Sequence, residues 1–210
     1  MELTRYDNLK TTLRQLLTGE LHRMSWNDMD EVFPGIFLGG VDAAKNAEKL
    51  KKLGVTHVVN SSYTTKPTFS ALGVGTSEEF YQRRGFECQF LGLPAVDISG
   101  FKISQYFDKA TDFIHSAVEN NGKVLVHCFM GVSRSATLVL AYLMLRQNMT
   151  APQALTHVRS KRLIHPNEGF LDQICHLHKR LYEYDPRATI TEINDEDNNE
   201  KENGQVMRLQ

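Results

Sequence analysis

The sequence is poor in cysteine, proline and tryptophan. Its 210 residues include three cysteines, six prolines and one tryptophan. A sparse and odd set of cysteines argues against a disulfide framework and for a reducing compartment. We therefore expect a cytoplasmic protein, with the nucleus as an additional location.

Long apolar runs and a strong charge of one sign are also missing. No apolar stretch is long enough to span a bilayer, and the first twenty residues are amphipathic and charged, so we expect neither a membrane span nor a signal peptide. The net charge is −1, but six acidic and only two basic residues follow Thr189, which leaves +3 on the rest of the chain. This small positive charge is compatible with a phosphorylated substrate, but it is too small to predict nucleic-acid binding.

Metal-ligand patterns are absent as well. Four histidines in the last third of the chain fit no standard spacing, and no cysteine pair supports them. We therefore predict no metal and no cofactor. These histidines are His157, His165, His176 and His178.

Hydrophobic periodicity predicts strands that alternate with helices. This pattern is typical of an α/β three-layer sandwich with a largely parallel central sheet flanked by helices. The predicted strands cover residues 32 to 40, 55 to 60, 86 to 93 and 124 to 127. The predicted helices cover residues 3 to 19, 43 to 53, 101 to 118, 135 to 146, 150 to 160 and 170 to 181, and residues 61 to 79 are expected to form a loop.

The composition divides the chain into three parts. Residues 1 to 23 hold an amphipathic helix, residues 24 to 185 form one globular domain, and residues 186 to 210 are an acidic, asparagine-rich tail that we expect to be disordered. The apolar stripe of the first helix needs a partner. We favour packing on its own domain over contact with a second subunit or with the edge of the active site.

The most informative stretch joins the strand at 124 to 127 to the helix at 135 to 146. A loop that opens a helix presents unpaired backbone N–H groups at the positive end of the helix dipole, where phosphate binds readily. Cys128 starts this loop, where the same groups favour its thiolate. Arg134 closes it, and its guanidinium fork can hold two oxygens of one phosphate. A nucleophile, Cys128, and an arginine that binds the same phosphate, Arg134, together predict phosphoryl transfer through a covalent cysteine intermediate.

The alternative is that Cys128 has only a structural role, since a lone cysteine is more often a small, buried, hydrophobic residue. A strand before the loop, a helix after it and Gly131 within it favour the phosphate loop instead. Ser135, the residue after the arginine, is compatible with a helix cap or with a role in catalysis.

The sequence of residues 127 to 136 resembles the His-Cys-x5-Arg-Ser signature of cysteine-dependent protein tyrosine phosphatases. Together with residues 141 to 144 it is similar to the dual-specificity branch. The small, atypical VHR-type members are similar over residues 24 to 184. The resemblance implies the dual-specificity phosphatase fold, and hydrolysis of phosphotyrosine and phosphoserine/threonine through a phosphocysteine without a cofactor.

Asp97 is the candidate general acid and base. It lies 31 positions before Cys128 in a loop bracketed by Pro94 and Gly100, and such loops commonly carry functional residues. The leaving alkoxide or phenoxide needs a proton, and the resemblance puts Asp97 at the family's acid position. The alternative, a cap of the following helix, suits Ser99 better.

The resemblance also assigns supporting roles. His127 would orient the loop and support the thiolate, Ser135 would help the thiolate leave, and Asn167 would brace the loop from outside. Arg162 would lie at the pocket mouth, where some relatives bind a second phosphate; the equal alternative is a solvated surface arginine.

Five residues between the cysteine and the arginine would bind substrate, mainly through backbone N–H groups. None is basic, whereas the lipid phosphatases of the superfamily carry basic residues there, so a phosphoinositide substrate is disfavoured. These five residues are Phe129, Met130, Gly131, Val132 and Ser133.

The expected partners are phosphorylated proteins, with MAP kinases among the candidates, and the chain would be a monomer or a homodimer. A non-catalytic phosphate-binding module and a phosphatase of RNA 5′-phosphates or carbohydrate are the competing classes. Cys88 would be a buried strand residue or a trap for oxidised Cys128, and Cys175 a core residue.

Overall fold

A five-stranded sheet lies at the centre of the computed structural model, which describes residues 5–19, 27–65 and 73–182. Its strand order is β1-β2-β5-β3-β4. Only β1 and β2 are antiparallel, and the other neighbours run parallel, which confirms the largely parallel sheet. The strands are β1 (Met29–Phe33), β2 (Ile36–Gly39), β3 (His57–Asn60), β4 (Gln89–Gly92) and β5 (Val124–His127).

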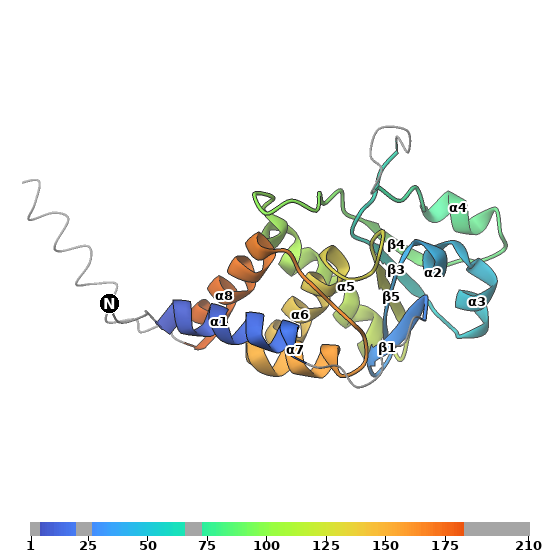
Figure 1. Ribbon diagram of the computed structural model, residues 1–210. Coiled ribbons are helices and arrows are strands. Elements are labelled where there is room, and N and C mark those ends of the chain that lie inside the picture. Colours follow the sequence, from blue (N-terminus) through green and yellow to red (C-terminus); the bar gives the residue numbers. More distant parts are fainter. Residues whose placement is uncertain (1–4, 20–26, 66–72, 183–210) are drawn as a thin grey trace, which may run out of the picture.

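Helices cover both faces of the sheet (Figure 1). A short 3-10 helix, η1 (Ile103–Tyr106), leads into α5. The larger group consists of α5 (Phe107–Glu119), α6 (Arg134–Arg146), α7 (Ala151–Arg159), α8 (Glu168–Tyr182) and α1 (Arg5–Thr18), and the smaller group of α2 (Val41–Lys45), α3 (Ala47–Lys52) and α4 (Glu78–Gln82).

Alternating strand residues divide the interior into two cores. On β5, Val124 and Val126 belong to the larger cluster, under α5 to α8, while Leu125 belongs to the smaller one, under α2 to α4. All three side chains are fully buried. Because both faces are covered, the first three residues of the strand are all apolar, as expected for a central parallel strand.

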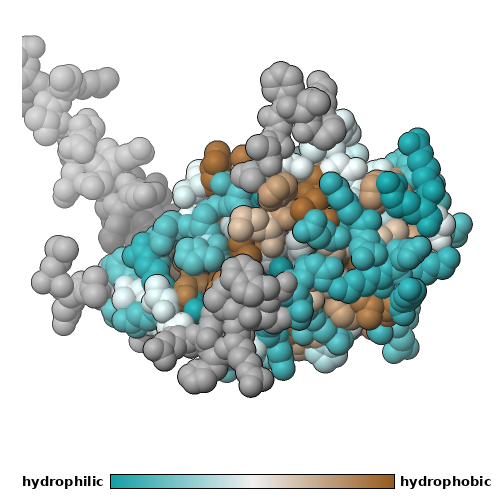
Figure 2. Space-filling model, turned by 45° about the vertical axis from the view of Figure 1, so that its right-hand side comes forward, coloured by the Kyte–Doolittle hydropathy of each residue, from teal (hydrophilic) through white to brown (hydrophobic). Residues whose placement is uncertain are grey.

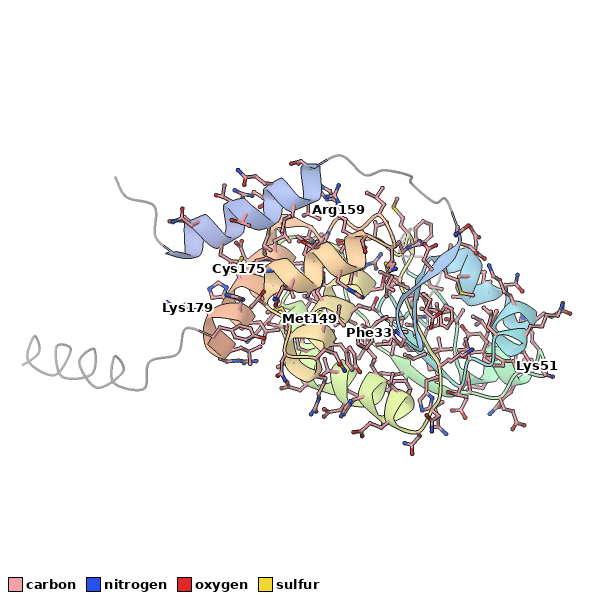
Figure 3. The ribbon with its side chains drawn as sticks, turned by 90° about the horizontal axis from the view of Figure 1, so that it is seen from below. Phe33, Lys51, Met149, Arg159, Cys175 and Lys179 are labelled. Carbon is pink, nitrogen blue, oxygen red and sulfur yellow. The ribbon has the colours of Figure 1, made fainter. Side chains whose placement is uncertain are left out.

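Helix α6 is the centre of the larger core, and ten of its residues from Ser135 to Met144 are buried. Helix α1 lies across α7 and α8 (Figure 3). Its Leu13 and Leu17 are buried in the same cluster as α6. This is the packing on its own domain that the sequence favours. The predicted boundary at residues 23 and 24 and the predicted tail of residues 186 to 210 lie outside the described residues.

Three predictions about the elements were wrong. Residues 32 to 40 form the end of β1 and all of β2, because Gly35, with φ of +76°, turns the chain between them. The helix at 43 to 53 is interrupted at Asn46, whose side chain accepts a hydrogen bond from the Lys49 N–H and starts α3. The predicted loop ends in α4, which Ser77 caps through the Phe80 N–H.

The surface offers no broad apolar belt on the face drawn in Figure 2, where hydrophobic residues form separate patches among hydrophilic ones. Among the described residues, no helix has the length and apolar character that a membrane span requires.

Candidate active site

The loop between β5 and α6 surrounds Cys128, whose side chain is only 1% exposed. Its Sγ accepts hydrogen bonds from the Gly131 N–H and from the Ser135 hydroxyl, each at 3.2 Å. Gly131 has φ of +74°, and a Cβ there would lie 2.3 Å from the carbonyl oxygen of Gly39. Only glycine therefore allows the backbone to turn this N–H onto the sulfur.

The carbonyl oxygens of four successive loop residues are held from outside the loop. Phe129 O accepts from the Val41 N–H at 2.8 Å, and Val132 O accepts from the His165 N–H at 2.7 Å. Between them, Met130 O and Gly131 O accept from Arg162 at 3.4 and 3.1 Å. Because C=O and N–H point in opposite directions across a trans peptide, this arrangement turns the next N–H groups toward the inside of the loop.

Arg134 and Asp97 meet at the end of this loop. Arg134 Nε lies 3.3 Å from Asp97 Oδ2, and Arg134 Nη1 donates to the carbonyl of Ala95 at 3.2 Å. The Arg134 side chain is 4% exposed, whereas that of Asp97 is 21% exposed. The structure thus brings the predicted clamp and the predicted acid together, with the carboxylate at the more open position.

Two further groups hold the Asp97 carboxylate. The Ser133 hydroxyl and the Asn167 side-chain amide both donate to Oδ1 at 2.8 Å. Neither Asp97 nor Ser99 caps a helix, since the residue before η1 is Lys102. Asn167 was expected to brace the phosphate loop, and it reaches the loop through Ser133 and Asp97.

The start of α8 lies directly against the loop that carries Asp97. Asn167 Oδ1 accepts from the Phe170 N–H at 3.0 Å and so closes the first turn of the helix. A Cβ on Gly169 would lie 1.8 Å from the carbonyl oxygen of Ser99. Glycine is required there because two backbone segments meet, and the contact fixes where Asp97 can lie.

His127 lies fully buried behind the cysteine. Burial lowers its pKa to about 4; the hydrogen bond to the Cys128 carbonyl opposes this shift and the Arg134 charge adds to it. The imidazole is therefore neutral near pH 7. Its Nδ1 lies 3.3 Å from Cys128 O, and its Nε2 lies 3.3 Å from Thr76 Oγ1.

Sequence reasoning missed the polar network that supports His127. The N–H and the hydroxyl of Ser61 both donate to His127 O at 2.8 Å. Asn60 Nδ2 donates to Thr76 Oγ1 at 3.0 Å. The available signal was the polar run Asn60, Ser61 and Ser62 directly after a buried strand, all of which the structure buries.

Arg162 contacts a different part of the loop from Asp97 and is 8% exposed. Besides its two bonds to loop carbonyls, its Nη1 donates to Asp30 Oδ2 at 2.7 Å and to Asn27 O at 3.0 Å. The alternative of a solvated surface arginine is therefore wrong. Asp30, which lies 132 positions earlier, was not predicted as part of the site.

The two remaining cysteines differ from Cys128. Cys175 is fully buried in the larger core, as expected, and Cys88 packs partly buried against the smaller one. Burial raises the pKa of each thiol to about 12. Both are therefore protonated thiols near neutral pH.

Comparisons with known proteins identify relatives of this chain. The dual specificity phosphatase catalytic domain matches residues 36–180. Human dual specificity protein phosphatase 26 is 44% identical over 169 residues, which are 80% of this chain and 74% of that protein. Human dual specificity protein phosphatase 13B is 43% identical over 77% of this chain and 81% of its own length. The crystal structure of human DUSP28 has a TM-score of 0.63 and 27% identity, and the match covers 76% of this chain and 99% of that one.

The chain belongs to the dual specificity phosphatase family. This confirms the family that the sequence motif predicts. The chain is thus a hydrolase, a protein phosphatase of dual specificity.

Proposed function

We propose that the chain hydrolyses phosphotyrosine and phosphoserine/threonine in proteins through a phosphocysteine on Cys128. The thiolate attacks phosphorus, the bond from phosphorus to the ester oxygen breaks, and Asp97 gives its proton to the departing oxygen. Water then attacks the phosphocysteine while the Asp97 carboxylate takes a proton from it. The products are inorganic phosphate and the regenerated thiolate.

One observation carries this proposal: four successive carbonyls of the loop are bound from outside, so that its N–H groups turn inward around the cysteine sulfur. Inward N–H groups stabilise both a bound phosphate and the charge that develops during transfer. Arg134, which closes the loop, would add a bidentate contact to two phosphate oxygens.

Asp97 and Ser135 suit the two proton-dependent steps. Asp97 lies 3.3 Å from the Arg134 guanidinium, so a phosphate bound to Arg134 would bring its ester oxygen near the carboxylate. Ser135 donates to the Cys128 sulfur, which would stabilise the thiolate when it leaves the phosphocysteine. His127, neutral and buried, would hold the loop by hydrogen bonds and take no part in proton transfer.

Replacement of the nucleophile tests the mechanism. Cys128→Ser should abolish turnover of an aryl phosphate and of phosphopeptides, because a serine alkoxide forms far less readily than a thiolate. The variant should still bind a phosphotyrosine peptide in titration calorimetry. Substantial turnover by Cys128→Ser would rule out the covalent cysteine mechanism.

A substrate panel tests the class of substrate. The wild type should hydrolyse phosphotyrosine and phosphothreonine peptides in preference to RNA 5′-phosphates and inositol phosphates, because the loop side chains between Cys128 and Arg134 carry no basic group. MAP kinase activation loops stay candidate protein substrates, and Thr-x-Tyr phosphopeptides are the direct probe for them.

A further inference from the structure

A cavity lies against the phosphate loop, on its Arg162 side. Its volume is about 460 Å³, within the range of ligand pockets. Phe129, Met130 and Val132 of the loop form one wall, so the cavity adjoins the site of phosphoryl transfer. Met130, at 64% exposure, stands out from the loop beside it.

The lining is mostly apolar and carries two carboxylates. Val41, Phe129 and Leu163 supply much of the apolar surface, and Asp28 and Asp42 supply the acidic groups. A long side chain with an apolar stem and a charged end would satisfy both parts of this surface.

The charges around the cavity do not balance. Arg162 is paired with Asp30 at 2.7 Å, and Asp28 is paired with Lys49 at 2.5 Å. Asp42, exposed in the first turn of α2, forms no ion pair within the described part of the chain. Among the residues that the structure describes, the cavity therefore has one negative charge in excess.

We propose that this cavity binds a lysine or arginine side chain of the substrate, from a residue near the phosphorylated one. The stem would lie on Val41, Phe129 and Leu163, and the cationic end would meet Asp42. This inference rests on the proposed function, since it concerns the substrate of the same loop, and it names the sequence around the phosphorylated residue that the enzyme prefers.

The same geometry disfavours a second phosphate in this cavity. To bind one, Arg162 would have to leave Asp30 and the carbonyls of Met130 and Gly131, which hold the loop in shape. The phosphate would also lie near the Asp42 carboxylate, and like charges repel. A Thr-x-Tyr segment should therefore be a better substrate with one phosphate than with two.

A peptide series provides the test. The parent is a phosphotyrosine peptide flanked by alanines, and arginine replaces each flanking alanine in turn. Each kcat/KM is divided by that of an aryl phosphate for the same enzyme, so that a general change in activity cancels. At one position or more, arginine should raise the ratio about three- to ten-fold, as expected for a partly exposed charge contact. Glutamate or phosphothreonine there should lower it.

Two substitutions of equal charge change locate the effect. Asp42→Lys should abolish the preference for arginine and favour glutamate at the same position. Glu48→Lys is the matched control, because Glu48 is also exposed in the first turn of a short helix but does not line the cavity. It should keep the arginine preference.

The proposal is overturned if no arginine position is preferred, if the doubly phosphorylated peptide is the better substrate, or if both lysine variants change the preference equally. Failure of the wild type to hydrolyse the aryl phosphate would instead refute the proposed function. In that case, binding of the same peptides to Cys128→Ser still measures the cavity, and an arginine preference there would support it.

Discussion

Two arginine–aspartate pairs flank the phosphate loop, and they are built differently. Arg134 and Asp97 lie 3.3 Å apart, and Asp97 keeps 21% of its side chain exposed. Arg162 and Asp30 lie 2.7 Å apart and are 8% and 11% exposed. The first pair is loose and open at its acidic end, whereas the second is short and closed.

The partners of the two pairs differ as well. Asp97 is held by side chains, Ser133 and Asn167, that can exchange one acceptor for another. Arg162 is held by backbone carbonyls of the loop itself and of Asn27. Under the proposed mechanism, the Arg134–Asp97 pair would serve the chemistry, because a phosphate can replace one of its contacts. The Arg162–Asp30 pair holds the backbone of the loop.

The largest expected effect is on the open pair. Asp97→Asn keeps the size of the side chain but has no acidic proton to give. For a substrate with a poorly acidic leaving alcohol, kcat should fall by about two to four powers of ten. Steady-state kinetics with a phosphothreonine peptide measures this, and a loss below ten-fold would remove Asp97 from the role of acid.

Breaking the closed pair should reduce stability. Arg162→Ala removes the cation beside the largely buried Asp30 carboxylate, which keeps only the hydrogen bond from Asn27 Nδ2 at 2.9 Å, and it releases two loop carbonyls. The free energy of unfolding should fall by about 3–5 kcal/mol, as measured by urea denaturation. Arg14→Ala is the control, because its pair with Glu168 is about half exposed and should contribute at most about 1 kcal/mol. Equal losses in the two variants would contradict the structural role of Arg162.

Gly169→Ala tests how the open pair is positioned. The added methyl group would overlap the Ser99 carbonyl and displace the loop of Asp97 from the start of α8. A misplaced catalytic group of this kind typically costs up to about 10²-fold in rate. The loss should be largest for substrates that need the acid, in kinetics that compare a phosphothreonine peptide with an aryl phosphate. A uniform loss on both would mean that the displacement reaches the whole loop.

His127, which lies behind the loop, should have a smaller and pH-dependent effect on the free energy of unfolding. Because His127 has its pKa lowered to about 4 in the folded chain, against about 6.5 when unfolded, the unfolded state binds more protons between these values. Stability should therefore fall as pH falls through this window, by about 2 kcal/mol between pH 7 and pH 5 from this residue. His127→Gln should flatten the pH dependence of urea unfolding, and an unchanged pH dependence would show that His127 can be protonated in place.

The sequence predicted the residues of the phosphate loop better than the residues outside the loop that hold it in shape. Cys128 and Arg134 lie in one short motif between a strand and a helix, so that local pattern was enough. Asp30 and Arg162 meet across 132 positions, and no local pattern connects them. The hairpin between β1 and β2 did have a local signal, the turn dipeptide Pro34-Gly35, but the apolar residues on both sides of it led to the prediction of one strand.

The most direct test of the difference between the two pairs is the dependence of kcat/KM on the acidity of the leaving alcohol, measured for wild type, Asp97→Asn and Arg162→Lys with a series of aryl and alkyl phosphates. Loss of the acid should make Asp97→Asn much more sensitive to the leaving group, because only acidic alcohols leave without a proton. Arg162→Lys should lower all rates together and keep the wild-type sensitivity. An unchanged sensitivity in Asp97→Asn, or an increased one in Arg162→Lys, would contradict this division of roles.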